Sequence, residues 1–542
     1  MKNTIKLNGN QASKYKFLTE RSVGLLIWMV ICGIAAYLRF TNLPANPGWY
    51  SDEGTVVEIA KNFLAGRIQY LAFNESTLLA ARMPLFPIFL AGIFSFAEVG
   101  ITTLRYVTAG LGVCTVGLLY WVILDIVGKE RIFLPITASL FLAIYPQAIL
   151  YSRLGFSYNL LAPLLVGMLW VLWKYLNTGR IKWILLASLL VGVGAISDLM
   201  MFAVAPVIVL VAITKKWKDA FLTSGVIILP FTLYSLLMLT FHTGAFLFDF
   251  EFIFFRLGEI PLIAQYPIIV YNFTTLLMED YWWSLAVIGI FIIPECRFKY
   301  LILMMFFTPL SLLARTALLP GLSFYYLSPL FPLIALGAAS LVVRGVPYAL
   351  EITRKGLEKF TDVFRSMDKK NRFEFIWKPG IFIASSLILF LVIISPFVIT
   401  FALGIYQAHE GLKTEIDPVL VNVLDARKAI AYVNNRVSKD ELVLASPALA
   451  WAIEANAADF QMAVAYQGGE TKHFPTDIPA NRFIFDANYN QAAYVILDPI
   501  WWNWAVPNMP EVEDMVQVVT SWPKVYSAGQ VVVYENPLRN IK

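Results

Sequence analysis

Cysteine and histidine are scarce in this chain of 542 residues, which contains three of each. Cys32, Cys114 and Cys296 all lie in or beside apolar stretches, and the C-terminal part of the chain has no cysteine. A disulfide framework in that part is therefore excluded, and a zinc or iron–sulfur cluster has no support. No glycine-rich phosphate loop follows a predicted strand, and no repeat of fixed period is visible. These absences argue against redox chemistry.

Charge is scarce as well. Charged residues make up 15% of the chain and hydrophobic residues 58%, with a mean hydropathy of +0.67. A soluble protein could not bury so much apolar surface, so the composition predicts a polytopic α-helical membrane protein. The net charge of +5 gives no reason of its own to expect a nucleic acid partner. In a membrane protein the position of each Lys and Arg matters more than their sum.

The apolar runs and the basic loops together predict a topology. We expect roughly eleven spans in a plasma (inner) membrane protein, with residues 1–21 in the cytoplasm and a transmembrane region over 22–404. The short apolar segment 84–97 is too short to cross and is expected to be re-entrant or tilted. Residues 344–378 form a basic cytoplasmic loop, in which a helix that touches anionic headgroups is expected over 345–375. The predicted spans are 22–40, 104–127, 132–150, 160–174, 183–196, 199–213, 220–241, 284–294, 300–318, 324–343 and 380–403.

Two regions on the predicted outer side differ from the rest. The outer loop 242–283 is dense in aromatic residues, which suits either a plain interfacial belt or a lid over a lipid-linked ligand. Residues 405–542 are more polar and predict a small extracytoplasmic α/β domain. Its expected helices are 425–437 and 511–521, and its expected strands are 441–446, 493–498 and 530–535. The lone His473 is expected to be structural, and the aromatic run 501–504 after Asp498 to dock on the membrane.

An acidic pair follows the first span, in the outer loop 41–83. Ser51 is expected to cap a helix whose first turn holds Asp52 and Glu53 and which stops near Gly66. The pattern predicts a short helix lying on the membrane surface. The two acids could be ordinary solvated first-turn residues, and at most one is expected to face a site because neighbours point in different directions on a helix.

Three further outer-side motifs accompany this pair. They are Ala81-Arg82-Met83-Pro84-Leu85-Phe86, then Tyr151-Ser152-Arg153 through Ser157-Tyr158-Asn159, and Tyr325-Tyr326-Leu327-Ser328-Pro329. In this order and spacing, over residues 20–345, the four resemble the protein O-mannosyltransferase and aminoarabinose-transferase superfamily. These proteins are multi-span glycosyltransferases of the GT-C class that use polyprenyl-phosphate sugars. The resemblance implies a GT-C-like helical fold.

The resemblance also implies roles for single residues. Asp52 corresponds to the catalytic base with Glu53 beside it, Arg82 to the cation that binds the donor phosphate, and Arg153 to the arginine of a Ser-Arg pair. The chain departs from the family pattern where an acid and a basic residue are expected: it has Tyr158 and Asn159 at the first place, and Tyr325 before Tyr326 at the second. Asp198 could substitute for the missing acid or be a solvated turn residue. A divalent ion bridging Asp52 and the phosphate is left open, since the missing acids weaken a metal site.

The chemistry fits this assignment. A polyprenyl phosphate leaves as an anion, so one base suffices to take the proton from an acceptor hydroxyl, and a single displacement predicts inversion. Arginines must neutralise the developing charge, and Arg82, Arg153, Arg256 and Arg315 lie near predicted outer ends, against the positive-inside bias. The partners are a polyprenyl-phosphate sugar, the bilayer and an acceptor that is a protein, lipid or glycan. The alternatives are a transporter or flippase of lipid-linked substrates and a non-catalytic scaffold, which the release of polyprenyl phosphate would distinguish.

Overall fold

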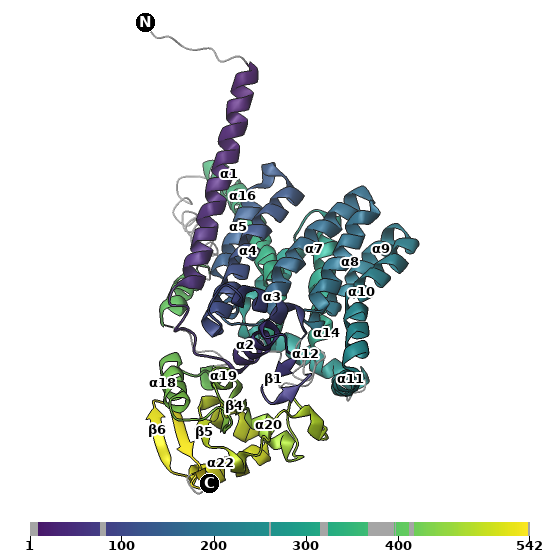
Figure 1. Cartoon of the computed structure of the whole chain (residues 1–542). Helices are drawn as coiled ribbons and strands as arrows, with labels where there is room; N and C mark the ends of the chain where they lie inside the picture. The colour runs from purple at the N-terminus through teal and green to yellow at the C-terminus, as the bar shows by residue number, and fades with distance from the viewer. Residues whose placement is uncertain are drawn as a thin grey trace.

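The structure, a computed structural model, describes residues 9–75, 83–258, 262–314, 324–366, 395, 397–410 and 417–539. Its helices form a bundle, and a smaller domain containing the C-terminal residues is attached to one end of it (Figure 1). The first helices of the bundle are α1 (Gly9–Phe40), α4 (Ile101–Val127), α5 (Phe133–Ile144), α6 (Pro146–Ser152), α7 (Tyr158–Thr178), α8 (Ile181–Ala195) and α9 (Ala205–Lys215). They are followed by α10 (Trp217–Phe241), α11 (Thr243–Gly258), α12 (Leu262–Glu279), α13 (Tyr281–Phe291), α14 (Cys296–Ala314), α15 (Phe324–Leu327) and α16 (Phe331–Ser366).

The membrane-spanning character is clear, but the predicted count of roughly eleven spans is not reached in the described part of the chain. Five helices there are long and apolar enough to cross a membrane, namely those at 22–40, 101–127, 158–178, 217–241 and 325–348. The bent pair α5 and α6, which meet at 59°, makes a sixth if it counts as one span. Four shorter apolar helices coincide with predicted segments, including α3 (Leu85–Phe94) in the predicted re-entrant segment. Most of the last predicted span, 380–403, lies outside the described residues.

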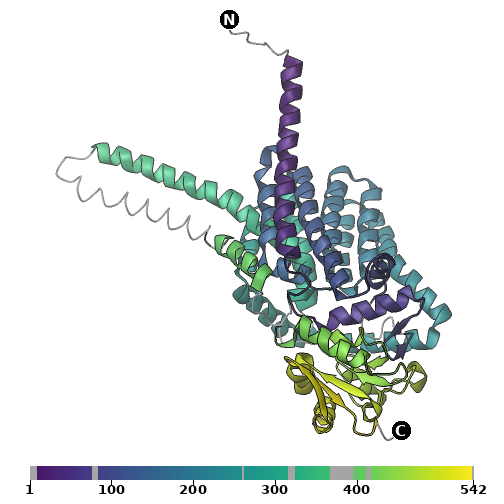
Figure 2. The same cartoon turned by 60° about the vertical axis from the view of Figure 1, so that its left-hand side comes forward.

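Two of the predicted loops contain helices. The predicted outer loop 242–283 contains the helices α11 and α12, although the phenylalanines of α11 recur at every second position from Phe246 to Phe254. The predicted basic loop 344–378 is helical as far as Ser366, as an extension of α16 that leaves the bundle (Figure 2). Exposed i,i+4 ion pairs such as Arg354–Glu358 support this extension. Residues 367–378 lie outside the described part of the chain.

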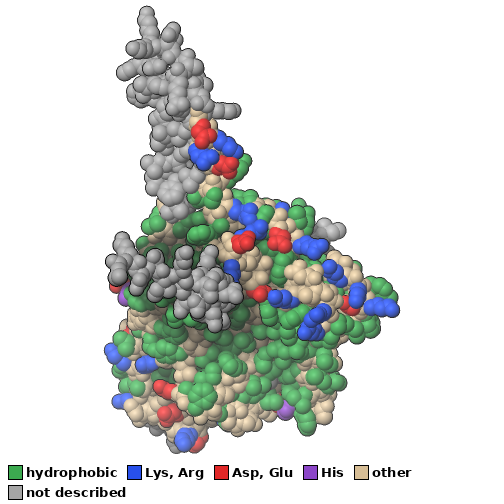
Figure 3. Space-filling model, turned by 90° about the horizontal axis from the view of Figure 1, so that it is seen from above, with side chains coloured by type: hydrophobic (Ala, Val, Ile, Leu, Met, Phe, Trp, Pro, Cys, Tyr) green, Lys and Arg blue, Asp and Glu red, His purple; other side chains and the backbone are tan. Residues whose placement is uncertain are grey.

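Basic side chains gather at the end of the bundle opposite the C-terminal domain. Lys129, Arg131, Arg180, Lys182 and Lys215 are all exposed where helices end or begin. Figure 3 views the molecule from above and shows Lys and Arg side chains spread over this end, among apolar ones. The distribution matches the loops that the sequence assigned to one side of the membrane.

Close packing of small residues joins two helices in the centre of the bundle. A Cβ placed on Gly289 of α13 would lie 1.8 Å from the carbonyl oxygen of Gly337 in α16. A Cβ on Gly337 would in turn lie 2.5 Å from the carbonyl oxygen of Ala286. Glycine at both positions therefore lets the two backbones touch, as small residues do between transmembrane helices.

The C-terminal domain is built on a five-stranded sheet with the order β4-β3-β5-β7-β6. The strands are β3 (Leu442–Leu444), β4 (Asn456–Ala458), β5 (Tyr494–Leu497), β6 (Lys524–Ala528) and β7 (Val531–Glu535). The first three strands in that order run parallel, and the pairs β5–β7 and β6–β7 are antiparallel. All five predicted elements are present, with the helices at α18 (Val423–Asn434) and α22 (Pro510–Thr520). The sequence missed β4, β6, α19 (Pro447–Ala450) and α20 (Phe460–Tyr466).

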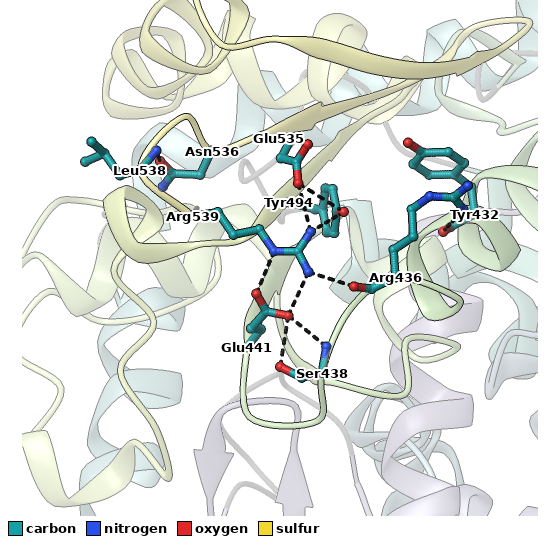
Figure 4. Close-up of polar contacts among 9 residues, drawn as sticks. All are labelled: Tyr432, Arg436, Ser438, Glu441, Tyr494, Glu535, Asn536, Leu538 and Arg539. Carbon is teal, nitrogen blue, oxygen red and sulfur yellow. Dashed lines mark hydrogen bonds and ion pairs between the residues drawn. The ribbon is translucent and has the colours of Figure 1, made fainter. Parts of the chain in front are cut away.

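An arginine near the end of the described chain joins several parts of this domain (Figure 4). Arg539 donates from Nε and Nη2 to the two carboxylate oxygens of Glu441, at 2.6 and 3.0 Å. It also donates to Glu535 Oε1 at 2.8 Å, to the backbone oxygen of Arg436 at 2.7 Å, and to the Tyr494 hydroxyl. These contacts fasten the segment after β7 to β5 and to the loop before β3.

The domain is held against the bundle by the segment that follows the first span. Trp49 and Val421 pair as an antiparallel bridge, and Ile484 donates its N–H to the Ala72 oxygen at 2.9 Å. The ion pair between Arg482 and Asp249, at 3.1 Å, adds a buried link to α11. Helix α2 (Ser51–Leu64) lies between the bundle and the domain (Figures 1 and 2).

Candidate functional site

Helix α2 begins one residue earlier than the expected cap at Ser51 would require, and the acidic pair lies in its first turn. The helix begins at Ser51, so Tyr50 and not Ser51 is the N-cap residue. Glu53 reaches back and accepts from the Tyr50 N–H at 3.0 Å, the backward half of a capping box. The helix ends at Leu64, and Gly66 follows with a φ of +72°, as a helix stop requires.

The expectation that α2 lies on the membrane surface is wrong. Nearly every residue from Glu53 to Ala60 is buried, because α2 is covered on one side by α3 and on another by α19 of the C-terminal domain. A Cβ on Gly54 would lie 1.9 Å from the Pro447 carbonyl oxygen, so the two backbones touch. The first turn of α2 is therefore fixed inside the protein.

Glu53 is the most tightly held residue of the site. Its carboxylate is fully buried and forms two hydrogen bonds with Arg105 of α4, at 2.7 Å from Nε and 2.6 Å from Nη2. It also accepts from the Gly155 N–H at 2.9 Å. Arg105 donates to the carbonyl oxygens of Pro47 and Gly48 as well, at 2.6 and 2.7 Å. Glu53 thus ties the segment that follows α1 to α4 and to the loop between α6 and α7.

Asp52 points elsewhere, as the i,i+1 geometry predicts. It is half-buried, and its charge and Tyr50 lie within electrostatic range of the Tyr325 hydroxyl. Tyr325 comes from the fourth sequence motif, more than 270 positions further along the chain. The fold therefore brings the first and fourth motifs together at the bundle end that faces the C-terminal domain.

A wall of aromatic rings surrounds this point. Tyr325 stacks on Phe156 with centroids 5.3 Å apart and on Tyr158 at 6.0 Å, and it touches Tyr326 at 4.3 Å. Tyr50 contacts Phe156 edge-on at 5.5 Å. The third motif therefore joins the other two through contacts between aromatic rings.

Asn159 and Asp198 shape the same region through the backbone. Asn159 donates to the carbonyl oxygens of Tyr151, Leu154 and Phe156 at 2.9, 3.0 and 3.2 Å. It is buried and holds the turn that carries the third motif. Asp198 accepts from Ser157 Oγ at 3.2 Å and from the Met200 N–H at 3.0 Å. Asp198 is thus next to the third motif and caps the helical turn that follows it.

The structure gives Arg153 a different position from the expected one. Only 1% of the residue is exposed, and its terminal nitrogens donate to backbone carbonyls of Leu38 at 2.9 Å and Asn46 at 2.7 Å. These groups belong to the end of α1 and the loop after it, so Arg153 satisfies carbonyls that the helix end leaves without partners. Arg39 does the same for α5, donating to Leu142 and Ala143. Neither guanidinium presents its terminal nitrogens to a phosphate.

The remaining predicted cations are not described. Arg82 and Arg315 lie outside the described residues, and the Arg256 side chain does as well. The described neighbour Leu85 donates its N–H to the Ile196 oxygen at 3.0 Å. This bond anchors the start of α3 beside the Asp198 loop, so the second motif enters the same region as the other three.

An apolar hollow lies beside Tyr326. Its other lining residues are Leu161, Leu165, Met200, Met201, Val204, Pro309, Pro329 and Leu330. The hollow is adjacent to the aromatic wall, and its free volume of about 20 Å³ is close to that of one water molecule.

The donor set for a metal ion is incomplete in the described part of the chain. There, no three His, Cys, Asp or Glu side chains gather in a group that could hold a metal. Glu53 is committed to Arg105, and Asp198 is bonded to Ser157 and Met200. The divalent ion at Asp52 stays a prediction, and these residues do not fit it.

The sequence reasoning missed Arg105, although it carried a signal. Arg105 is an ionisable residue inside an apolar run, and such residues mark functional or structural partners in membrane helices. Tyr70 and Asp459, which connect α2 with the C-terminal domain, carried no signal because their contact depends on the tertiary structure.

Comparisons with known proteins place the fold. No family model and no curated protein matches the chain in sequence. ArnT from Cupriavidus metallidurans in the apo state is similar in structure, with a TM-score of 0.59 and 13% identity over 97% of this chain and 98% of ArnT. The same ArnT bound to undecaprenyl phosphate gives 0.58 and 14%, over 96% and 98% of the two chains.

A second relative in structure is longer. The archaeal oligosaccharyltransferase AglB from Archaeoglobus fulgidus, in complex with an inhibitory peptide and a dolichol-phosphate, has a TM-score of 0.51 and 14% identity. The match covers 91% of this chain and 72% of AglB. These similarities confirm the fold that the four motifs predicted: the chain has the fold of the GT-C glycosyltransferases.

Proposed function

We propose that the protein is a membrane glycosyltransferase that moves a sugar from a polyprenyl-phosphate donor to an acceptor hydroxyl at the outer face of the membrane. One observation carries the proposal. The motifs around Asp52, Tyr158 and Tyr325, which are far apart in sequence, meet at one point of a GT-C fold. Structural neighbours with this fold were determined with undecaprenyl phosphate or a dolichol-phosphate bound.

Asp52 serves as the base in this proposal. It takes the proton from the acceptor hydroxyl while the oxygen attacks the anomeric carbon of the sugar. The bond between that carbon and the phosphate oxygen breaks, and the polyprenyl phosphate leaves as an anion, with inversion at the anomeric carbon. Tyr158, Tyr325 and Tyr326 bind the sugar, because their rings and hydroxyl groups suit its apolar faces and its own hydroxyls.

The donor phosphate requires cations in a site of low dielectric constant. Arg153 is assigned to the loop structure because its terminal nitrogens already bond to Leu38 and Asn46. The phosphate is therefore assigned to Arg82, as the resemblance implies, with Arg256 and Arg315 as further candidates.

The orientation follows from charge. The basic end of the bundle is assigned to the cytoplasm by the positive-inside rule, which puts the aromatic wall and the C-terminal domain outside. The acceptor then approaches from the extracytoplasmic side. A flippase or a scaffold does not need a base at this wall, so catalytic turnover distinguishes the transferase from these two alternatives.

The test is purified full-length protein in nanodiscs with undecaprenyl-phosphate-linked sugars of the hexose and pentose classes. The proposal expects release of undecaprenyl phosphate that depends on an acceptor. Asp52→Asn should lower the rate by about 10²–10⁴-fold, the usual contribution of a general base, without lowering the melting temperature. Asp125→Asn, at a half-exposed ion pair with Lys174, is the control. Saturable binding without release would contradict the transferase, and full turnover by Asp52→Asn would remove Asp52 from the base role.

A further inference from the structure

Helix α2 turns a polar face toward the C-terminal domain. Thr55, Glu58 and Asn62 are spaced by three and four residues, so they lie on one face, and all three are buried. Asn62 donates to the Glu58 carboxylate at 2.8 Å, and Lys61 pairs with Glu58 at 2.6 Å. Lys61 also donates to the Trp451 carbonyl oxygen in the domain, at 2.9 Å. The polar face is therefore a built contact with the domain.

A line of hydrogen bonds runs from the domain to the first turn of α2. The Tyr70 hydroxyl donates to the Asp459 carboxylate at 3.0 Å and bonds the Thr55 hydroxyl at 3.2 Å. Thr55 Oγ1 in turn is 3.4 Å from the Ser51 carbonyl oxygen, which it bonds as a donor. Asp459 is 1% exposed and Tyr70 2%. Ser51 directly precedes Asp52, so the line ends one peptide bond from the proposed base.

We propose that the C-terminal domain holds Asp52 in its working position through this line, and that Asp459, Tyr70 and Thr55 are positioning residues of the transferase. The inference rests on the proposed function for the role of Asp52. The structural part stands independently: removing the Tyr70 hydroxyl should loosen the first turn of α2 whether or not transfer is observed. The domain then affects catalysis by positioning Asp52, without contacting the reacting groups.

The protonation state of Asp459 sets the direction in which the hydrogen bonds of this line are donated. With Asp459 ionised, Tyr70 donates to it, and the Thr55 proton is shared between the Tyr70 oxygen and the Ser51 carbonyl. With Asp459 protonated, the carboxyl donates to Tyr70, Tyr70 donates to Thr55, and Thr55 gives its proton wholly to Ser51. The line of hydrogen bonds then contains one more proton, and the hydrogen bond from Thr55 to the first turn becomes stronger.

This reversal falls in an accessible pH range. Burial raises the pKa of Asp459 from its ordinary value of 3.8 to about 6, although hydrogen bonds from Met462 and Tyr70 oppose the rise. The charged groups that face the line from α2 are Glu58 and Lys61. On the domain side, His473 bonds Gln461 in α20, two positions after Asp459. A rise in pH through about 6 therefore loosens the first turn of α2.

The experiment is amide hydrogen exchange of the full-length protein, read by mass spectrometry over residues 51–58, at pH values from 5 to 7.5 and corrected for intrinsic exchange. Tyr70→Phe keeps the ring and removes the hydroxyl. We expect about tenfold faster exchange of the first turn, the factor that corresponds to one hydrogen bond. In the transfer assay we expect kcat to fall by about the same factor with KM unchanged, as for an interaction that only orients the base.

Matched variants separate positioning from folding. Tyr120→Phe removes another hydroxyl from a buried ring, one that donates to the Gly24 oxygen far from the line, and should leave residues 51–58 unchanged. Thr55→Val should act like Tyr70→Phe, and Thr55→Ser should restore the wild-type behaviour. Asp459→Asn should abolish the change in exchange near pH 6. Wild-type exchange in both Tyr70→Phe and Thr55→Val would overturn the inference. Absence of transfer by the wild-type protein, with these exchange effects present, would overturn the proposed function alone.

Discussion

Glu53 and Arg105 form a two-pronged ion pair with no exposed surface on either side chain, where the start of α2 meets α4. The same carboxylate accepts the N–H groups of Tyr50 and Gly155, so four segments meet at one residue. The acidic pair of the sequence is thus divided between two tasks. Glu53 holds the structure, and its neighbour Asp52 is left facing the aromatic wall.

Breaking this pair should be strongly destabilising. Glu53→Gln or Arg105→Ala leaves one charge buried without its partner, which costs about 3–5 kcal/mol in the free energy of unfolding. Arg105→Lys should also fail to restore stability, because a lysine cannot bond Glu53 through two nitrogens and reach the Pro47 and Gly48 oxygens. The measurement is thermal unfolding in detergent. Asp125→Asn, at the half-exposed pair with Lys174, should change it by less than about 1 kcal/mol.

Gly54 controls how α2 seats on the C-terminal domain. Gly54→Ala puts a methyl group 1.9 Å from the Pro447 carbonyl oxygen, so α2 and α19 must separate. Because backbone atoms cannot move apart by this much at low cost, we expect a loss of about 1–3 kcal/mol in the free energy of unfolding, which is typical of overpacking. We also expect faster proteolysis of the segment between the bundle and the domain. Gly92→Ala in α3, where a Cβ would meet nothing within 4 Å, is the control. Equal protease resistance of the two variants would contradict the tight contact.

Asp498 should make stability depend on pH in the opposite direction from a paired surface carboxylate. Burial raises its pKa from 3.8 to about 6. Hydrogen bonds from the Ser446 hydroxyl and from the N–H groups of Ile500 and Trp501 oppose this rise. The unfolded chain loses this proton near pH 4 and the folded chain loses it near pH 6. The stabilisation of the folded state by protonated Asp498 is therefore full below pH 4 and is lost as the pH rises through 6. The difference between wild type and Asp498→Asn should change by about 3 kcal/mol over this interval. A constant difference would contradict the raised pKa.

Arg539 should stabilise the end of the domain sheet where β5, β7 and the loop before β3 meet (Figure 4). Its carboxylate partners Glu441 and Glu535 raise its pKa, so it stays charged at any working pH. Arg539→Lys loses the fork that bonds both Glu441 oxygens, and we expect a loss of about 1–2 kcal/mol in unfolding free energy. Arg354→Ala, at an exposed pair on the α16 extension, should give no measurable change. The two variants are compared by denaturant unfolding.

Much of the fold could be predicted because its causes are local. Apolar length marked the helices, and short apolar runs rich in β-branched residues marked strands such as β5 and β7. The convergence of Asp52 with Tyr158 and Tyr325 came from a resemblance in motif order, since spacing alone gives no three-dimensional distance.

The errors come from contacts that form only in the folded chain. The burial of α2 depends on a domain more than 350 residues further along, and the polar face of Thr55, Glu58 and Asn62 is equally typical of a solvated surface. Arg153 was expected at a phosphate because it stands against the charge bias. The structure shows that helix ends inside a bundle create the same demand for a cation, through carbonyl groups without partners.

The parallel strands of the C-terminal sheet have one more consequence. Ser446, Asp459 and Asp498 follow β3, β4 and β5, so they line the carboxyl rim where open α/β sheets usually receive small molecules. Here all three are sealed: Ser446 and Asp498 bond each other, and Asp459 bonds Tyr70. The rim is therefore a contact surface for α2. Recognition of an acceptor by this domain is confined to the other faces of the domain.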